Sequence, residues 1–494
     1  MTTYTEGPRS GTARAALTRR SVVAGAVGNL IEWYEFGVYA YFATVIAADF
    51  FTPRGGGAAE ALVRTYASFA LAFFFRPVGA FLLGRFGDRF GRRPALVVAV
   101  LATTSATAAI GLLPTYATVG AAAPWLLTAL RIVQGLSAGG EFGGAVALMT
   151  ECAPAGKRGT YGAWQSLTVA LGLLVGAAAA TLVTALLTAE QITAWGWRLP
   201  FLAALPMGAV ALWLRLRLAE SPAFLRARQE PVAEGAGGAG GAGGAGGAGG
   251  AGGAGGAGGA GGPEGVGGGG GAEVAPEGWR AQVAEGGSDG RRAGRGVVVV
   301  STVVLGCGRL MAWSAAGYTF LVVLPTYLQQ TVGRSPRQAL LATVVANLGF
   351  AAAILPAGRL SDRMGRRPVM VTGAVLAALA ALPLLHVVQD RRSPVWLMGG
   401  AVALAGVLVG LLAGPGPAML AEMFPTRARH TGLGVAYALA NAVFSGCAGL
   451  LITELVQRTG DPDIPAYYVV VTCALGAVAL ATLRGDDHRR ALRE

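Results

Sequence analysis

The chain has 494 residues, of which 53% are hydrophobic and 13% charged, and its formal net charge is +13. A soluble globular protein carries about 25% charged residues, so the composition excludes that class and indicates a membrane protein. The positive charge does not indicate nucleic-acid binding, because the basic residues lie in the connections between long apolar segments. The four Cys residues are scattered, without the spacing of a disulfide framework or a metal site.

Apolar segments follow one another along the chain, and most approach the roughly 20 residues that a transmembrane helix needs. The polar residues 1–20 precede them, and the first apolar run is too long for the core of a cleavable signal. We predict an all-α membrane protein with twelve transmembrane helices, at residues 21–46, 64–84, 94–113, 122–150, 160–187, 197–218, 296–328, 337–358, 368–388, 395–421, 431–457 and 465–483.

The distribution of positive charge orients these helices. An even number of spans places both termini on one side, and the connections on that side carry most of the 39 Lys and Arg residues. The positive-inside rule therefore predicts cytoplasmic N- and C-termini in a multi-pass protein of the cell membrane. The opposite loops carry few basic residues, namely Arg54, Arg64, Arg334, Arg337, Arg391, Arg392 and Arg458.

A Gly/Ala-rich stretch divides the predicted helices into two sets of six. Residues 235–262 repeat Gly-Gly-Ala, a composition that favours a flexible coil because it buries no apolar surface. The predicted organisation is a cytoplasmic arm (1–20), an N-terminal six-helix bundle (21–218), a flexible cytoplasmic linker (219–295), a C-terminal six-helix bundle (296–483) and a cytoplasmic tail (484–494).

One basic motif occurs twice between predicted helices. Residues 84–94 read Gly-Arg-Phe-Gly-Asp-Arg-Phe-Gly-Arg-Arg-Pro, and residues 358–368 repeat most of them at the same spacing. Four Arg and one Asp cannot lie in hydrocarbon, so we expect each copy to form a short hairpin at a membrane face. Gly permits the tight turn, and Pro suits the first turn of the following helix. The repeat indicates one membrane unit used twice in parallel, which is typical of transporters.

A second motif, Glu-x-x-Pro-x-x-x-Arg, ends the fourth and the tenth predicted helix. Its two copies run from Glu151 to Arg158 and from Glu422 to Arg429. They are separated by nearly the same number of residues as the two copies of the basic motif. Both motifs therefore indicate the same internal duplication.

The repeated basic loops resemble the signature of the major facilitator superfamily, and Arg131-x-x-Gln134-Gly135 is similar to its second motif. Stretches such as 28–36, 137–144 and 195–201 resemble the metabolite:proton symporter family within it, which includes α-ketoglutarate, citrate, shikimate and proline/betaine permeases. The resemblance implies the major facilitator fold, two six-helix bundles that transport by alternating access, and inward transport of a small metabolite with protons.

The repeated motifs are expected to work as gate and conformational elements. We expect Asp88 and Asp362 to brace a cytoplasmic gate by pairing with Arg or with the N-terminus of a neighbouring helix. The predicted set is Gly84, Asp88, Arg89, Gly91, Arg92, Arg131, Gln134, Glu151, Arg158, Asp362, Arg363, Arg366, Glu422 and Arg429.

Ionisable residues inside the predicted spans are candidates for the transport site, because charges are costly in a bilayer. Glu32 and Glu35 share one helix face, and Glu35 and Arg76 are predicted to lie at similar depth. We predict that Glu35 carries the proton while Arg76 binds a substrate carboxylate and also attracts Glu35. A static ion pair between helices is the alternative. Further candidates are Glu32 and Glu141 for proton coupling, and Arg198, Arg309 and Tyr318 for substrate binding.

These observations predict a proton-coupled secondary transporter that imports a small carboxylate-bearing metabolite. The alternatives are a proline/betaine-type zwitterion symporter, a drug:proton antiporter and a non-transporting receptor. The sequence shows no Walker loop, nucleophile triad or metal cluster, so we expect no enzymatic activity, no cofactor and no metal. The expected partners are the substrate, protons and the lipid bilayer, with no nucleic acid, and we expect a monomer.

The predicted orientation can be tested by thiol labelling in a variant whose four native Cys residues are replaced by Ser. A cysteine introduced at Ala117 is expected to react with a membrane-impermeant reagent in intact cells, and one at Ala155 only after permeabilisation, because basic connections stay inside. The reverse labelling pattern would invert the orientation.

Overall fold

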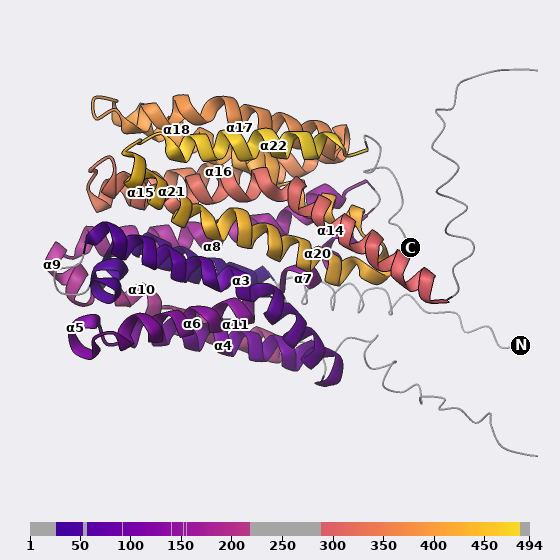
Figure 1. Ribbon diagram of the computed structural model, residues 1–494, viewed down its shortest axis with the longest axis horizontal. Helices are drawn as coiled ribbons and strands as arrows, with labels where there is room; N and C mark the ends of the chain where they lie inside the picture. The colour runs from indigo at the N-terminus through magenta and orange to yellow at the C-terminus, as the bar shows by residue number, and fades with distance from the viewer. Residues whose placement is uncertain are drawn as a thin grey trace, which may run out of the picture. The chain divides into compact units, whose positions relative to one another are not determined.

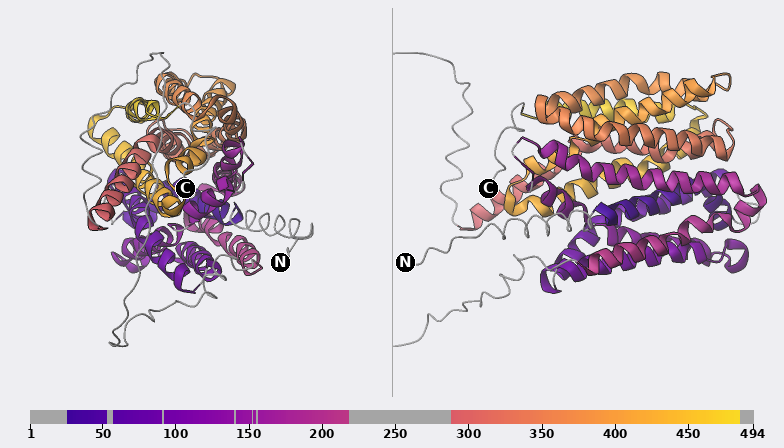
Figure 2. Two further views of the ribbon diagram at one scale, coloured as in Figure 1. Left: turned by 90° about the vertical axis from the view of Figure 1, so that its right-hand side faces the viewer. Right: turned by 180° about the vertical axis from the view of Figure 1, so that it is seen from behind.

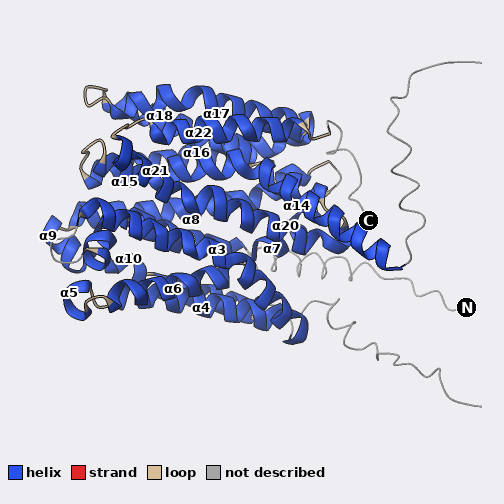
Figure 3. Ribbon diagram, viewed as in Figure 1, coloured by secondary structure: helices blue, strands red, loops and turns tan. Residues whose placement is uncertain are grey.

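The computed structural model describes residues 26–52, 57–90, 92–139, 141–151, 153–154, 156–217 and 288–484. Every secondary-structure element in these ranges is a helix (Figure 3). Within these ranges, the residues up to 217 and residues 298–484 form one compact unit. The predicted arm, nearly all of the predicted linker and all but the first residue of the predicted tail lie outside the described residues.

In the first half of the chain, residues 26–41 are helical and lead into α2 (Ala43–Ile46) and the π-helix η1 (Ala47–Phe51). The elements that follow are α3 (Ala58–Phe90), α4 (Arg92–Leu112), α5 (Tyr116–Val119), α6 (Ala122–Ala138), α7 (Glu141–Glu151), α8 (Arg158–Leu186), α9 (Ala189–Gln191), η2 (Ile192–Gly196), α10 (Arg198–Leu202) and α11 (Ala204–Leu216).

The second half begins with α14, which starts before the end of the predicted linker. Its elements are α14 (Ser288–Tyr318), η3 (Thr319–Val323), α15 (Leu324–Gln330), α16 (Pro336–Met364), α17 (Arg366–Gln389), α18 (Val395–Ala413), α19 (Gly416–Met423), α20 (Thr426–Ala440), η4 (Asn441–Gly446), α21 (Cys447–Thr459) and α22 (Ile464–Ala481).

Within the described residues, 10 helical stretches are long and apolar enough to cross a membrane. The other two predicted spans also fall on helices. One is the stretch 26–51, whose predicted start lies outside the described residues, and the other is α6 with α7, on either side of residue 140. The described helices therefore agree with the twelve predicted spans, although α3 and α16 extend further than predicted.

The basic motif differs from its prediction in one respect, because most of it is helical. In the second copy, α16 continues to Met364 and α17 starts at Arg366, so Gly365 alone makes the turn. The φ of Gly365 is +99°, a conformation that strains any residue with a side chain. The predicted hairpin is therefore too long, because Arg, Leu and Met favour a helix and only one position needs the freedom of Gly.

The helices pack in two groups that follow the two halves of the chain (Figure 1). In the first half, α3 packs on α6 and α4 packs on α6 and α11, whereas in the second half α16, α17, α18 and α22 pack on one another. Seen from the end in Figure 2, the indigo-to-purple helices and the orange-to-yellow helices lie on different sides. The halves meet where α8 packs along α16 and where α3 contacts η4 and α21.

Glycines at equivalent positions let helices approach closely in both halves. A Cβ atom on Gly135 of α6 would collide with the carbonyl oxygen of Ala72 in α3, and one on Gly406 of α18 would collide with that of Ala346 in α16. Small residues at helix interfaces serve this purpose in membranes. Gly139 packs in the same way, since its backbone lies against the carbonyl group of the α3 residue one turn beyond Ala72.

Large apolar side chains cover the outside of the helices. Leu379 and Val478, for example, are 71% and 70% exposed. An apolar exterior of this extent would aggregate in water but suits contact with lipid. Trp125 and Trp396 are also exposed near the first turns of α6 and α18, where aromatic rings mark a membrane interface.

The close helix contact in the first half predicts a position-specific effect of one methyl group. Gly135→Ala is expected to lower the free energy of unfolding by about 1–3 kcal/mol, because the backbone of α3 must move away. The matched control Gly400→Ala lies in open space in α18 and is expected to be neutral or to stabilise by up to about 1 kcal/mol. Thermal unfolding of the purified proteins measures both, and equal melting temperatures for the two variants would contradict the packing role.

Candidate functional site

A buried ion pair joins the helix over residues 26–41 to α3. Nη2 of Arg76 lies 3.0 Å from Oε1 of Glu32, and their side chains are only 4% and 8% exposed. Removing two charges from water costs several kcal/mol per ion, so such a pair persists only where close contacts compensate for the cost. This pair is therefore the first candidate for a functional site.

Aromatic rings supply part of that compensation. The guanidinium carbon of Arg76 lies 4.3 Å from the ring centroid of Phe73, 4.4 Å from that of Phe36 and 5.6 Å from that of Trp33. Cation–π contacts of this kind gain strength when they are removed from water. Arg76 is consequently held by one carboxylate and three rings.

Arg131 occupies a second, fully buried position nearby. Its guanidinium carbon lies 4.2 Å from the ring centroid of Tyr39, and its Nη1 donates a hydrogen bond of 2.6 Å to Gln134. Gln134 in turn donates to the hydroxyl of Thr107 at 2.7 Å. Arg131 thus links the fourth predicted span to the first through an aromatic ring, within a network that also reaches α4.

A small cavity adjoins the ion pair. Its volume of about 10 Å³ accommodates about one water molecule, which is too little for an organic substrate. Because both halves of the chain line it, access depends on their relative movement. The lining residues are Asn29, Glu32, Trp33, Arg76, Ala138, Gly139, Phe142, Gly434, Tyr437 and Ala438.

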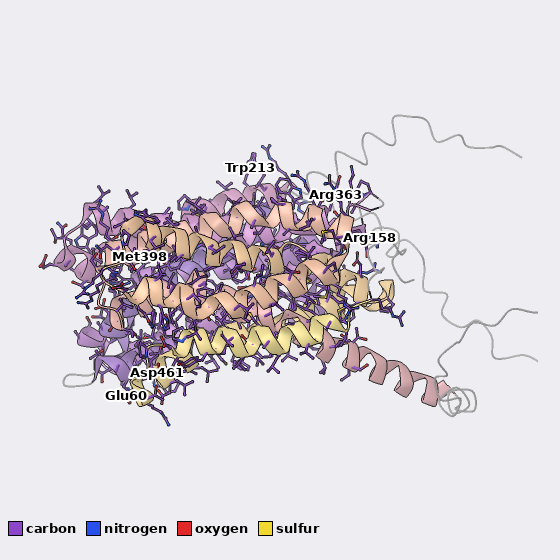
Figure 4. The ribbon with its side chains drawn as sticks, turned by 90° about the horizontal axis from the view of Figure 1, so that it is seen from above. Glu60, Arg158, Trp213, Arg363, Met398 and Asp461 are labelled. Atoms are coloured by element: carbon purple, nitrogen blue, oxygen red, sulfur yellow. The ribbon has the colours of Figure 1, made fainter. Side chains whose placement is uncertain are left out.

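The two copies of the Glu-x-x-Pro-x-x-x-Arg motif pair with each other on one side of this cavity. Nη1 of Arg429 lies 2.7 Å from Oε1 of Glu151, and Nη1 of Arg158 lies 3.7 Å from Oε1 of Glu422. Each Glu therefore pairs with the Arg of the other copy. Figure 4 places Arg158 and Arg363 toward the same end of the helices, which we call the motif end.

Asp362 adds a second connection between the halves at the motif end. Its carboxylate accepts hydrogen bonds from the backbone N–H groups of Gly159 (2.7 Å) and Thr160 (2.8 Å), in the first turn of α8. This turn has free N–H groups and a partial positive charge, so a carboxylate binds favourably there. Asp362 also lies 2.8 Å from Arg366, which pairs with Glu422 at 3.0 Å. The predicted pairing of Asp362 with an Arg and with a helix N-terminus is confirmed.

The halves also touch from the Arg76 site toward the opposite end, where Figure 4 labels Glu60. A Cβ on Gly446 would lie 3.0 Å from Cβ of Phe73, and the backbone of Gly449 lies directly against the ring of Tyr66. Nε2 of Gln457 donates a hydrogen bond of 2.8 Å to a backbone carbonyl at the start of α3. Contacts on both sides of a cavity of this size describe an occluded conformation.

The structure distinguishes between the two acids of the first predicted span. Glu32 is the acid that lines the cavity and pairs with Arg76, whereas Glu35 was the predicted partner. Glu35 is fully buried about one helical turn further along and interacts electrostatically with Arg131. Sequence spacing places both acids on one helix face, but the depth of Arg76 decides which of them faces it.

Two predicted substrate residues lie away from the cavity. Arg198 donates to the carbonyl groups of Gly111 (2.9 Å) and Leu113 (2.7 Å), at the end of α4. Arg309 donates to the hydroxyl of Thr482 at 2.8 Å and thereby links α14 to the end of α22. Neither side chain lines the cavity, and these contacts support a structural role in joining helices.

The remaining predicted residues lie as follows. Tyr318, at the end of α14, is buried among the rings of Trp33, Phe69 and Phe73. Gly84 has open space where a Cβ would lie, Arg363 is exposed, and Arg89 stacks on Phe90 in the last turn of α3. The residue Gly91 and the side chains of Asp88, Arg92 and Glu141 lie outside the described part of the chain.

Sequence reasoning missed the aromatic contacts between the halves. The rings of Phe142 in α7 and Tyr437 in α20 stack with centroids 3.3 Å apart and planes within 5°. Tyr66, Phe69 and Phe73 share one face of α3 and contact Tyr318 or the glycines of the second half. Their spacing of three and four residues is a visible signal, but a lipid-facing stripe has the same periodicity.

Comparison with known proteins gives matches over nearly the whole chain. Residues 21–235 match the family model described as Sugar (and other) transporter, and residues 300–494 match the model described as Major Facilitator Superfamily. The ectoine/proline transporter ProP of Corynebacterium glutamicum is 30% identical over 466 residues, covering 94% of this chain and 83% of the relative. The proline/betaine transporter of Salmonella typhimurium is 28% identical over 472 residues, covering 95% and 84%.

Solved structures show a similar fold. The proton:xylose symporter XylE bound to 6-bromo-6-deoxy-D-glucose superposes with a TM-score of 0.68 at 17% identity, covering 94% of this chain and 95% of that one. An inward-open conformation of XylE from E. coli gives a TM-score of 0.64 at 17% identity. At this level of identity the likeness concerns the fold alone.

The contacts of Asp362 predict that its charge keeps the motif end closed. Asp362→Asn is expected to raise the population open at this end about tenfold or more, since hydrogen bonds to a charged group contribute about 1.5–3 kcal/mol. Spin labels at the exposed positions Lys157, just before α8, and Arg363, on α16, measure the distance between the halves. The control Asp390→Asn removes an exposed carboxylate before α18. An unchanged distance distribution in Asp362→Asn, or an equal change in the control, would contradict this role.

Proposed function

Because the chain belongs to the major facilitator superfamily of multi-pass membrane transporters, we propose that it is a proton-coupled symporter importing a proline- or betaine-type zwitterion across the cell membrane. The names of the relatives favour this reading over the carboxylate-bearing metabolite that ranked first from sequence. The bundles at 21–218 and 296–483 are proposed to move against each other as a monomer. Residues 219–295 tether them, and both termini are cytoplasmic.

The observation that carries this proposal is the Glu32–Arg76 pair on the wall of the cavity. A zwitterion can supply a new partner to both members of the pair. Its carboxylate pairs with Arg76 in place of Glu32, and its ammonium group faces Glu32 in place of Arg76. A simple carboxylate would occupy Arg76 and leave Glu32 buried without its cation, which is costly. The ring of Trp33, also on the cavity wall, suits a methylated ammonium group.

Alternating access needs one end of the molecule to open while the other stays closed. The ion pairs and the Asp362 contact are proposed as the gate at the motif end, and the contacts of Gly446 and Gly449 as the gate at the opposite end. The substrate would enter the cavity when the contacts at the opposite end separate. Opening of the motif end would then release it to the cytoplasm.

Proton coupling is proposed to rest on Glu35. Glu32 is occupied by the ammonium group when the zwitterion is bound, which leaves Glu35 as the second carboxylate of the buried cluster. Glu35 is fully buried and interacts electrostatically with Arg131, so its protonation changes the charge balance next to the substrate. Glu32 and Glu141 remain the next candidates for the proton site.

Transport by the purified protein in liposomes tests this function. A pH gradient, acidic outside, is expected to drive accumulation of proline or glycine betaine and not of α-ketoglutarate, citrate or shikimate. Glu35→Gln is expected to abolish this accumulation and to spare exchange of substrate across the membrane. Arg76→Lys is expected to raise the KM about tenfold or more, because Lys lacks the planar fork that holds a carboxylate.

The control for these variants is Glu60→Gln, which removes an exposed carboxylate from the start of α3 and is expected to transport as the wild-type protein does. Accumulation of a dicarboxylate in place of the zwitterions would contradict the proposed substrate class. Accumulation by Glu35→Gln against a gradient would assign the proton to another carboxylate.

A further inference from the structure

Tyr318, in the second half of the chain, packs on two of the rings that surround Arg76, and its hydroxyl is buried. We propose that this hydroxyl donates a hydrogen bond to the substrate carboxylate, which it shares with Arg76, and so makes Tyr318 a specificity-determining residue. The assignment rests on the proposed transport of a zwitterion. It adds the group that recognises the carboxylate from the opposite half.

The hydroxyl of Tyr318 has no hydrogen-bond partner among the residues that the structure describes, although the residue is only 5% exposed. Leaving a buried hydroxyl without a partner is destabilising, and buried polar groups of native proteins are rarely left so. Tyr318 is also the last residue of α14 before the π-helix η3, and π-helical turns often occur at functional sites.

Tyr318 and Arg76 share two aromatic neighbours. The ring of Tyr318 lies 5.5 Å from that of Phe73 and 6.1 Å from that of Trp33, in edge contacts. The same two rings lie against the guanidinium group of Arg76.

The chemistry of the free groups indicates what they bind. Nε of Arg76, like the hydroxyl of Tyr318, is buried and has no hydrogen-bond partner within the described ranges. An arginine N–H can only donate, and a phenol hydroxyl donates well to an anion. Two buried donors from opposite halves therefore match a ligand with two acceptor oxygens and a negative charge. A carboxylate has this geometry, whereas an ammonium group satisfies neither donor.

This arrangement ties substrate binding to closure. A carboxylate that accepts from Arg76 and Tyr318 together links α3 to α14 and thus one half of the chain to the other. Both contacts exist only when the halves are close, so the bound carboxylate favours the occluded conformation. A quaternary ammonium compound without a carboxylate, such as choline, lacks this link.

The test is Tyr318→Phe, which removes the hydroxyl and keeps the ring. Its Kd for glycine betaine, measured by calorimetry on the purified full-length protein, is expected to rise about 10- to 100-fold, because a hydrogen bond to a charged group is lost. Its melting temperature without substrate is expected to be unchanged or higher, because the variant lacks an unsatisfied buried donor.

The matched control is Tyr34→Phe, which removes a buried hydroxyl that donates to the carbonyl group of Pro200 at 2.7 Å. Here the expectation is reversed: a lower melting temperature and an unchanged Kd, because a satisfied hydrogen bond within one half is lost. The two variants together separate a binding role from a packing role.

Four outcomes would overturn the assignment. An unchanged Kd in Tyr318→Phe, or a raised Kd accompanied by a lower melting temperature, would show that the hydroxyl does not bind substrate. An equal loss of affinity for choline and for glycine betaine would show that the carboxylate is not its target. If the wild-type protein binds neither glycine betaine nor proline, the proposed function fails and the assignment with it. If the wild-type protein binds glycine betaine and Tyr318→Phe binds it equally well, only the assignment of Tyr318 fails and the proposed function stands.

Discussion

The cost of holding charge away from water shapes this molecule at every level. An ion inside a protein in a bilayer loses hydration worth several kcal/mol, and only close opposite charges, hydrogen bonds or ring faces compensate for that loss. Arg76 pairs with the carboxylate of Glu32 and lies against three aromatic rings. Arg131 donates a hydrogen bond to Gln134 and lies against the ring of Tyr39. Charges that lack such surroundings lie at the ends of the helices, where water and backbone carbonyl groups are available.

The internal duplication is preserved in the packing but not in the site. Gly139 lies against the carbonyl group of Arg76, and at the equivalent place in the second half Gly410 lies near the carbonyl group of Phe350. An apolar ring therefore takes the position of the buried arginine. The first half carries the paired charges, while the second half adds Tyr318 and Tyr437. The paired charges beside the cavity therefore come from one half of the chain only.

The two ends of the molecule are closed by different interactions. At the motif end, Glu151 is 43% exposed, and an ion pair with access to water contributes little net stability. Asp362 at the first turn of α8 is better shielded and adds specificity to the contact. Toward the opposite end, aromatic side chains pack against the backbones of Gly446 and Gly449. The contact there depends on shape complementarity and not on ion pairs.

The amino-acid sequence alone determined the helical class, the number of spans, the duplication and the buried charged residues, because these depend on apolar length and on motifs read along one chain. Only the tertiary structure decided that Glu32 pairs with Arg76 and that each Glu of the repeated motif pairs with the Arg of the other copy. It also decided that Arg198 and Arg309 join helix ends away from the cavity. The physical reason is that helix periodicity gives the face of a residue but not its depth against a neighbour. That depth is set by glycine contacts such as Gly135 against Ala72, between residues far apart in the sequence.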